Sequence, residues 1–158
     1  MNKYTKPEVN EGELTPNPFL KNLEIPITEF KSPNQFTKKG DEYEPVQKRI
    51  EYTPFGKMYC SSERRLAVNK LSLRAKELLL WIIYEVSHGQ SYLWINHKRF
   101  QKEQGIKSLN TYKGAVKELV DNKFLSVTSI DQVYHINPHY LFKGDRLKKF
   151  KDKVVKKN

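Results

Sequence analysis

The sequence lacks the residues on which several classes of protein depend. It contains one cysteine, Cys60, so an internal disulfide is excluded. The longest apolar run, Leu78 to Tyr84, is far shorter than the roughly 20 residues that span a bilayer. The N-terminus does not resemble a signal peptide. We therefore expect a cytoplasmic protein with no membrane partner.

Motifs of nucleotide-driven or metal-dependent catalysis are also missing. Neither GxxxxGK[ST] nor GxGxxG occurs in the chain. His135 and His139 are four residues apart, but Pro138 places them on an extended segment, where this spacing does not form a helical metal pair. Cys60 has no neighbour that would activate its thiol. We therefore expect no enzyme activity, no cofactor and no metal site.

Positive charge is what the chain has in excess. The formal net charge is +11 at pH 7, and the pI is about 9.6. Residues 1–54 carry eight basic and nine acidic residues, whereas residues 55–158 carry 21 basic and nine acidic ones. A surplus of this size attracts polyanions, and nucleic acid is the first candidate partner.

Proline divides the chain at the same place. Seven of the eight prolines lie before residue 55. Such a density removes backbone donors and prevents long helices, so residues 1–54 are predicted to form an extended or disordered arm that buries little surface. Within it, the apolar segment 17–27 has two open interpretations. It either covers the chain's own sheet or core as a short strand, or docks on a protein partner.

Residues 55–150 have the periodicity of one α+β domain. The order helix, strand, helix, helix, strand, strand is predicted for residues 73–87, 91–95, 97–104, 109–122, 124–130 and 132–136. Ser72, Asn96 and Ser108 are placed to cap the three helices. The first helix is apolar nearly all round, which predicts a central position. The basic residues 143–158 are predicted to form a helix that frays into a solvated tail, residues 151–158.

The helix predicted for residues 109–122 has two different faces. On a 3.6-residue period, one face carries the apolar residues Leu109, Tyr112, Val116, Leu119 and Val120. The other carries Asn110, Thr111, Lys113, Gly114 and Lys117. Glycine in a helix costs about 1 kcal/mol relative to alanine, so we infer that Gly114 lets another surface come close.

A helix, a turn containing Gly105, a second helix and a hairpin together favour a winged helix-turn-helix domain with an extended proline-rich N-terminal arm. Such helices enter the major groove by their N-terminal end, so base readout is assigned to Asn110, Thr111, Lys113 and Gly114. Phosphate contacts are assigned to the nearby cations Lys98, Arg99, Lys102, Lys107, Lys117 and Lys123. A solvated face of a basic protein would also present lysines, but the surrounding elements favour DNA.

Three blocks of the sequence carry a family resemblance. They are KLSLRAKELLLWIIYEV, NHKRFQKEQGIKSLNTYKGAVKELVDNKFLSV and VYHINPHYLFKGDR. Together they resemble the winged-helix region of the RepL family of plasmid replication initiators, found in Firmicute plasmids and also in phages. The ending INPHYLFKGDR, Ile136 to Arg146, is the part of the sequence that most resembles this family. The resemblance implies binding of double-stranded DNA at an origin and recruitment of host replication proteins, without catalysis, in a bacterial host.

Two other functions remain open on the sequence alone. A winged-helix transcriptional regulator would share the fold, and no ligand-sensing segment or long dimerisation helix is evident. A phage structural or interaction protein would use the segment 17–27 to dock on a partner. The target sequence and the oligomeric state, a homodimer included, are also open.

Overall fold

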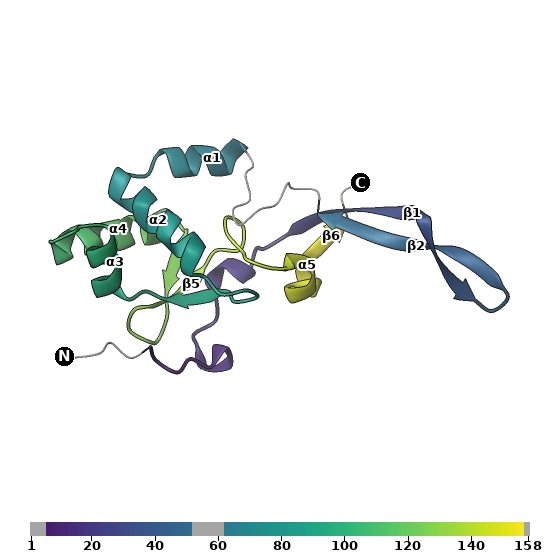
Figure 1. The fold of residues 1–158 in the computed structure, drawn as a ribbon, viewed down its shortest axis with the longest axis horizontal. Helices are drawn as coiled ribbons and strands as arrows, with labels where there is room; N and C mark the ends of the chain where they lie inside the picture. Colours follow the sequence, from purple (N-terminus) through teal and green to yellow (C-terminus); the bar gives the residue numbers. More distant parts are fainter. Residues whose placement is uncertain (1–5, 52–61, 157–158) are drawn as a thin grey trace.

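The structure is a computed structural model that describes residues 6–51 and 62–156 (Figure 1). Cys60 and the boundary expected near residue 54 lie outside the described residues. The central domain contains α1 (Ser62–Asn69), α2 (Leu73–Glu85), β3 (Tyr92–Trp94), α3 (His97–Glu103), α4 (Leu109–Asp121), β4 (Leu125–Val127) and β5 (Val133–Ile136). The fold is α+β, and from α2 onward its order is the winged-helix order that the sequence predicts. Helix α1 was not predicted.

The three predicted helix caps are confirmed. The Ala75 amide donates to Ser72 Oγ at 3.2 Å, and the Arg99 amide donates to Asn96 Oδ1 at 3.1 Å. Ser108 Oγ accepts from the amide of Thr111, the third residue of α4, at 3.4 Å. Each cap satisfies an amide that has no partner within its helix.

The wing is a small antiparallel sheet in the order β3-β5-β4. Tyr134 in the middle strand pairs with Leu93 on one side and with Val127 on the other. The turn between β4 and β5 is closed by Thr128, whose Oγ1 donates to Val133 O at 2.9 Å and accepts from the Ile130 amide at 3.1 Å. The hairpin predicted around residues 129–131 is therefore confirmed, with a longer turn and shorter strands.

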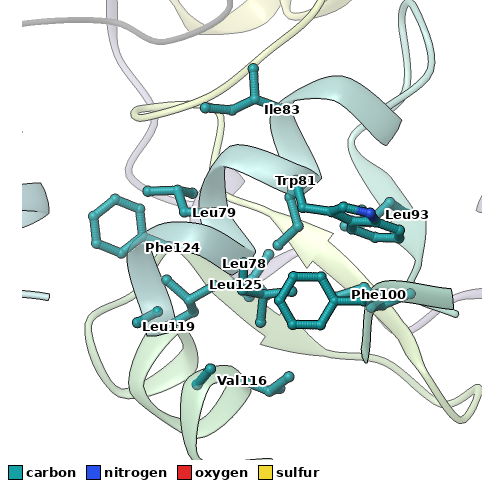
Figure 2. Packing of buried hydrophobic residues seen from close by; sticks show 14 of the residues in the cluster. Leu78, Leu79, Trp81, Ile83, Leu93, Phe100, Val116, Leu119, Phe124 and Leu125 are labelled. Carbon is teal, nitrogen blue, oxygen red and sulfur yellow. The ribbon is translucent and has the colours of Figure 1, made fainter. Parts of the chain in front are cut away.

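One apolar core holds the helices and the wing together (Figure 2). Leu78 and Ile82 from α2, Phe100 from α3 and Leu119 from α4 are fully buried in it. Removal of apolar surface from water, at about 25 cal/mol for each Å², supplies most of the stabilisation. Trp81 joins the core and donates from Nε1 to Glu103 Oε2 at 2.6 Å.

Helix α2 is less enclosed than the sequence predicts. Leu73, Leu80 and Tyr84 are 68%, 56% and 73% exposed. They are spaced by seven and four positions, so they lie on one side of the helix. The predicted central position is therefore wrong for this side of α2, because no described element covers it.

Residues 25–51 form a long β-hairpin that projects away from the helices (Figure 1). Its strands are β1 (Ile25–Lys39) and β2 (Glu42–Glu51), and their register shifts between Lys31 and Phe36. Pro33 lies in this irregularity, and Pro45 pairs with Phe36 just beyond it. The prolines that argue against helices are tolerated here because bulges and edge strands need fewer backbone donors. The sequence analysis did not anticipate the hairpin.

The residues that precede the hairpin pack against the central domain. They include two short 3-10 helices, η1 (Glu11–Glu13) and η2 (Pro18–Leu20). Leu14 is buried against β3 and β5, while Leu23 and Ile25 are buried against Phe142 and Phe150. The expectation that the first 54 residues bury little surface is therefore wrong. Of the two interpretations left open for segment 17–27, the structure supports the first, because Leu23 and Ile25 cover the chain's own core.

Polar contacts also hold the N-terminal residues in place. Ser91 Oγ donates to Glu11 Oε1 at 2.6 Å, and His135 Nε2 contacts the Thr15 carbonyl oxygen at 2.5 Å. The Asn17 side chain donates to the carbonyl of Ile136 at 3.1 Å. Burial lowers the pKa of His135, which favours the neutral ring, and a neutral Nε2–H can donate to Thr15.

The C-terminal residues differ from the solvated tail predicted for residues 151–158. Helix α5 (Arg146–Lys149) is followed by η3 (Lys151–Lys153) and by β6 (Val154–Lys156). Strand β6 runs parallel to β1, and the sheet order is β2-β1-β6. The burial of Phe150 and this strand pairing fix the segment, through contacts with residues that are distant in the sequence.

The ending INPHYLFKGDR is a structural connector in this fold. Asn137 Nδ2 donates to the Lys123 carbonyl at 2.7 Å, at the start of the wing. Arg146 is almost fully buried and donates from Nη1 to the Pro138 carbonyl at 2.6 Å. Asp145 caps α5 through the Lys148 amide at 3.0 Å. The motif therefore joins the wing to α5.

Candidate nucleic-acid interface

The polar face of α4 is open to solvent. Asn110, Lys113, Gly114 and Lys117 are exposed, and Thr111 is half-buried. A Cβ added at Gly114 would meet no atom within 4 Å. Internal packing therefore does not require glycine at this position, and the surface around it is open to a ligand.

The opposite face of α4 is sealed against the core. Tyr112, Ala115, Val116 and Leu119 are buried there, as the periodicity predicts for three of them. Leu109 was predicted to join them, but it is 41% exposed. It lies in the first turn, ahead of the residues of α4 that reach the core cluster. The prediction for Leu109 is therefore wrong.

Contacts with α2 and α3 fix the position of α4. Phe100 of α3 packs against the ring of Tyr112, with centroids 6.0 Å apart. Glu118 accepts hydrogen bonds from the Ser72 hydroxyl and the Ser72 amide, both at 2.6 Å. These bonds, the hydroxyl one first, lower the pKa of Glu118. The polar face is thus carried by a helix that is held near its start, at Tyr112, and in its second half, at Glu118.

The turn between α3 and α4 has the conformation that a helix-turn-helix requires. Gly105 has a φ of 64°, in the left-handed region that favours glycine. Ile106 follows and is buried, with its amide donating to the Gln101 carbonyl at 2.8 Å. The chain can therefore reverse within four residues and start α4 at the Ser108 cap.

All six predicted phosphate contacts are exposed, and five of them are lysines. The lysines are Lys98, Lys102, Lys107, Lys117 and Lys123. Lys117 pairs with Asp121 one turn later at 2.5 Å, but both side chains are more than half exposed. Exposed pairs of this kind are worth little, so a phosphate can compete for the ammonium group.

Arg99 differs from the other predicted phosphate contacts. Its guanidinium donates to Glu103 at 2.7 Å and to both carboxylate oxygens of Glu85 at 2.8 Å. It also lies 5.6 Å from the ring centroid of Trp81. The hydrogen bonds from Arg99 to Glu103 and then to Glu85 raise the pKa of the guanidinium. Two carboxylates thus already offset its charge, and its main contacts join α2 to α3.

A groove of about 260 Å³ lies between α4 and the wing. It is lined by Tyr112, Lys113, Val116, Lys117, Val120, Val127 and Tyr134. Two of the cations of α4 therefore stand at the edge of an apolar hollow, and Val127 on β4 is 63% exposed beside it. Sequence reasoning missed Val127. The alternation of β4 places its side chain outward, but only the fold places it beside α4.

The described residues offer no group of three or more side chains arranged to hold a metal ion. His135 lies in β5 and His139 in the connector that follows it, and burial lowers the pKa of both. No helix among residues 6–51 and 62–156 has the length and apolar character that a bilayer crossing requires.

The order of elements and the cationic exposed helix define a winged-helix-like protein. A family model described as Firmicute plasmid replication protein (RepL) matches residues 54–155. The match covers more than half of the chain, which therefore belongs to the RepL family of plasmid replication proteins, as the resemblance predicted. No curated protein and no solved structure gives a match.

Replacement of Gly114 with alanine tests whether the polar face of α4 contacts another surface. Because nothing lies within 4 Å of the new methyl group, we expect the free energy of unfolding to rise by about 1 kcal/mol. We also expect weaker DNA binding, because the methyl group would hold the helix away from the duplex. Denaturant unfolding and fluorescence anisotropy measure the two effects. Unchanged DNA binding would contradict a close approach at Gly114.

Proposed function

We propose that this protein initiates plasmid replication by binding double-stranded DNA at an origin through α4. The observation that carries the proposal is the division of α4 into a sealed apolar face and an exposed face with Asn110, Lys113 and Gly114. A helix held in this way can enter the major groove as a rigid unit. Membership of a plasmid replication family supports an origin as the target.

In this proposal the residues of α4 read the sequence and the surrounding lysines hold the backbone. Asn110 can pair with adenine, Lys113 can reach guanine acceptors, and Thr111 lies between them. Lys98, Lys102, Lys107, Lys117 and Lys123 bind phosphates. Affinity then decreases steeply as the salt concentration rises, because each neutralised phosphate releases counterions.

We infer that the protein itself catalyses no reaction. It marks the origin in the cytoplasm of the bacterial host, and the host replication proteins that it recruits carry out DNA synthesis. The basic winged domain supports the DNA contact, and the RepL family supports the replication role over transcriptional regulation or a phage structural role.

Two lysine variants test the assignment of roles. We expect Lys113→Ala to reduce the preference for the target over random duplex by about 1–3 kcal/mol, because a base contact is lost. Lys98→Ala should weaken binding to all duplexes alike and reduce the salt slope by about 1. Anisotropy titrations at several salt concentrations measure both. Equal effects of the two variants on target and random duplexes would overturn the assignment.

The origin is tested by selection of plasmid fragments with the purified protein. Enrichment of one region that supports replication when cloned in a host supplying the protein is the expected result. Enrichment of promoter-overlapping operators, with no effect on replication, would assign the chain to transcriptional regulation instead.

A further inference from the structure

A second hollow lies where the hairpin joins the central domain. It has a volume of about 370 Å³ and is lined by Arg49, Asp145, Leu147, Lys148, Lys151 and Val154. Three cations from three different elements, β2, α5 and η3, therefore converge on one concave surface. Part of its wall is fixed by the core, since Leu147 packs against the cluster that contains Phe150.

The lining of this hollow carries three cations and one carboxylate, Asp145, which leaves an excess of positive charge. Arg49 shares Glu29 with Lys156, at 2.9 Å and 2.7 Å, so one negative charge faces two positive ones. Within the described residues, Lys148 and Lys151 have no carboxylate within 4.0 Å, and both are exposed. A concave surface with unbalanced cations focuses a positive potential and selects anions.

The hollow is separate from the surface of α4. Helix α4 lies at one end of the long axis of the molecule, whereas α5 and β6 lie toward the hairpin (Figure 1). No residue lines both the hollow and the groove beside α4. A duplex held by α4 therefore reaches the hollow only if it extends or bends beyond the segment that α4 reads.

We propose that this hollow is a second phosphate-binding surface, which holds nucleic-acid backbone outside the segment contacted by α4. The proposal rests on the DNA binding proposed above and extends it from one contact to two. Spaced lysine and arginine groups on a rigid surface suit successive backbone phosphates, which carry no sequence information. The two contacts would give the protein a longer footprint than a single winged domain.

The test compares a hollow variant, Lys148→Gln with Lys151→Gln, with a control, Lys38→Gln with Lys39→Gln. The control loses two positive charges from the exposed tip of the hairpin. The full-length proteins are titrated with a duplex of about 11 base pairs, one helical turn, and with one of about 40. Circular dichroism and thermal unfolding confirm that both variants remain folded.

We expect the hollow variant to lose about 2 from the salt slope on the long duplex, about 0.9 for each phosphate contact. Its slope on the short duplex should equal that of the wild type, and the control should match the wild type on both. An unchanged slope on the long duplex, or equal losses on both duplexes, would overturn the proposal.

One further ligand separates a DNA contact from a site for free phosphate. Inorganic tripolyphosphate serves as a soluble source of phosphate. If it binds the wild type but not the hollow variant, while the long-duplex slope is unchanged, the DNA assignment is overturned. If the DNA binding proposed for α4 is wrong, Lys113→Ala and Lys98→Ala will leave binding of the short duplex unchanged. If only the second surface is wrong, those two variants will still weaken binding, and the hollow variant will not change the long-duplex slope.

Discussion

Replacement of Phe100 with alanine is expected to lower the free energy of unfolding by about 3–5 kcal/mol. The ring is completely buried and packs edge-on against Trp81, with centroids 5.6 Å apart, and against Tyr112 at 6.0 Å. It thus connects α2, α3 and α4 in the centre of the core (Figure 2). Its loss would leave a cavity under the polar face of α4. Urea unfolding followed by tryptophan fluorescence measures the change.

The matched control is Leu80→Ala, on the exposed side of α2. Leu80 is 56% exposed, so its removal should change stability by no more than about 0.5 kcal/mol. A similar loss of stability from both substitutions would show that Phe100 is not part of the core. At a temperature where Phe100→Ala stays folded, we expect its sequence preference to fall as well, because α4 loses its support.

Replacement of Gly144 with alanine is expected to lower the free energy of unfolding by about 1–3 kcal/mol. Gly144 has a φ of 133°, which residues with a Cβ rarely adopt. A Cβ there would lie 3.1 Å from the ring of His88 and 3.2 Å from the backbone nitrogen of Gly89. The latter amide donates to the carbonyl of Lys143 at 2.7 Å, so the two segments cannot easily separate. Thermal unfolding measures the loss.

A companion variant separates the sources of this cost. His88 is exposed, so it can be replaced without opening the core. In the double variant Gly144→Ala with His88→Ala, the stability lost through the contact of the new Cβ with the His88 ring should return, while the loss from backbone strain should remain. DNA binding supplies the second control. The folded fraction of Gly144→Ala should keep the wild-type salt slope, because the substitution removes no cation. Normal stability with a reduced slope would instead make the KGD segment a DNA contact.

Local signals explain why much of the winged domain could be predicted from the sequence. Ser72, Asn96 and Ser108 cap helices through bonds to residues three positions away, so the sequence contains both partners. The two faces of α4 likewise follow from one helical period, with Leu109 as the exception. Burial depends on neighbouring elements, which a helical period does not include.

Contacts between distant segments explain what could not be predicted. The role of Arg99 depends on Glu85, which α2 brings beside α3. Glu85 is 14 positions away, so the sequence alone does not show that it pairs with the guanidinium. The hairpin depends on the pairing of β1 with β2 and β6, whereas its prolines point to disorder when they are read singly. The hollow near α5 unites Arg49 with Lys148 and Lys151, and no local pattern links these residues.

The docking of the N-terminal residues on the wing has a consequence for the order in which the chain folds. Thr15 and His135 are 120 positions apart in the sequence, and Glu11 and Lys149 are 138 apart. Closing loops of this length costs more entropy than forming the contacts among α2, α3 and α4. The three-helix nucleus should therefore assemble first, and the leading segment should wrap around it in a later, slower step.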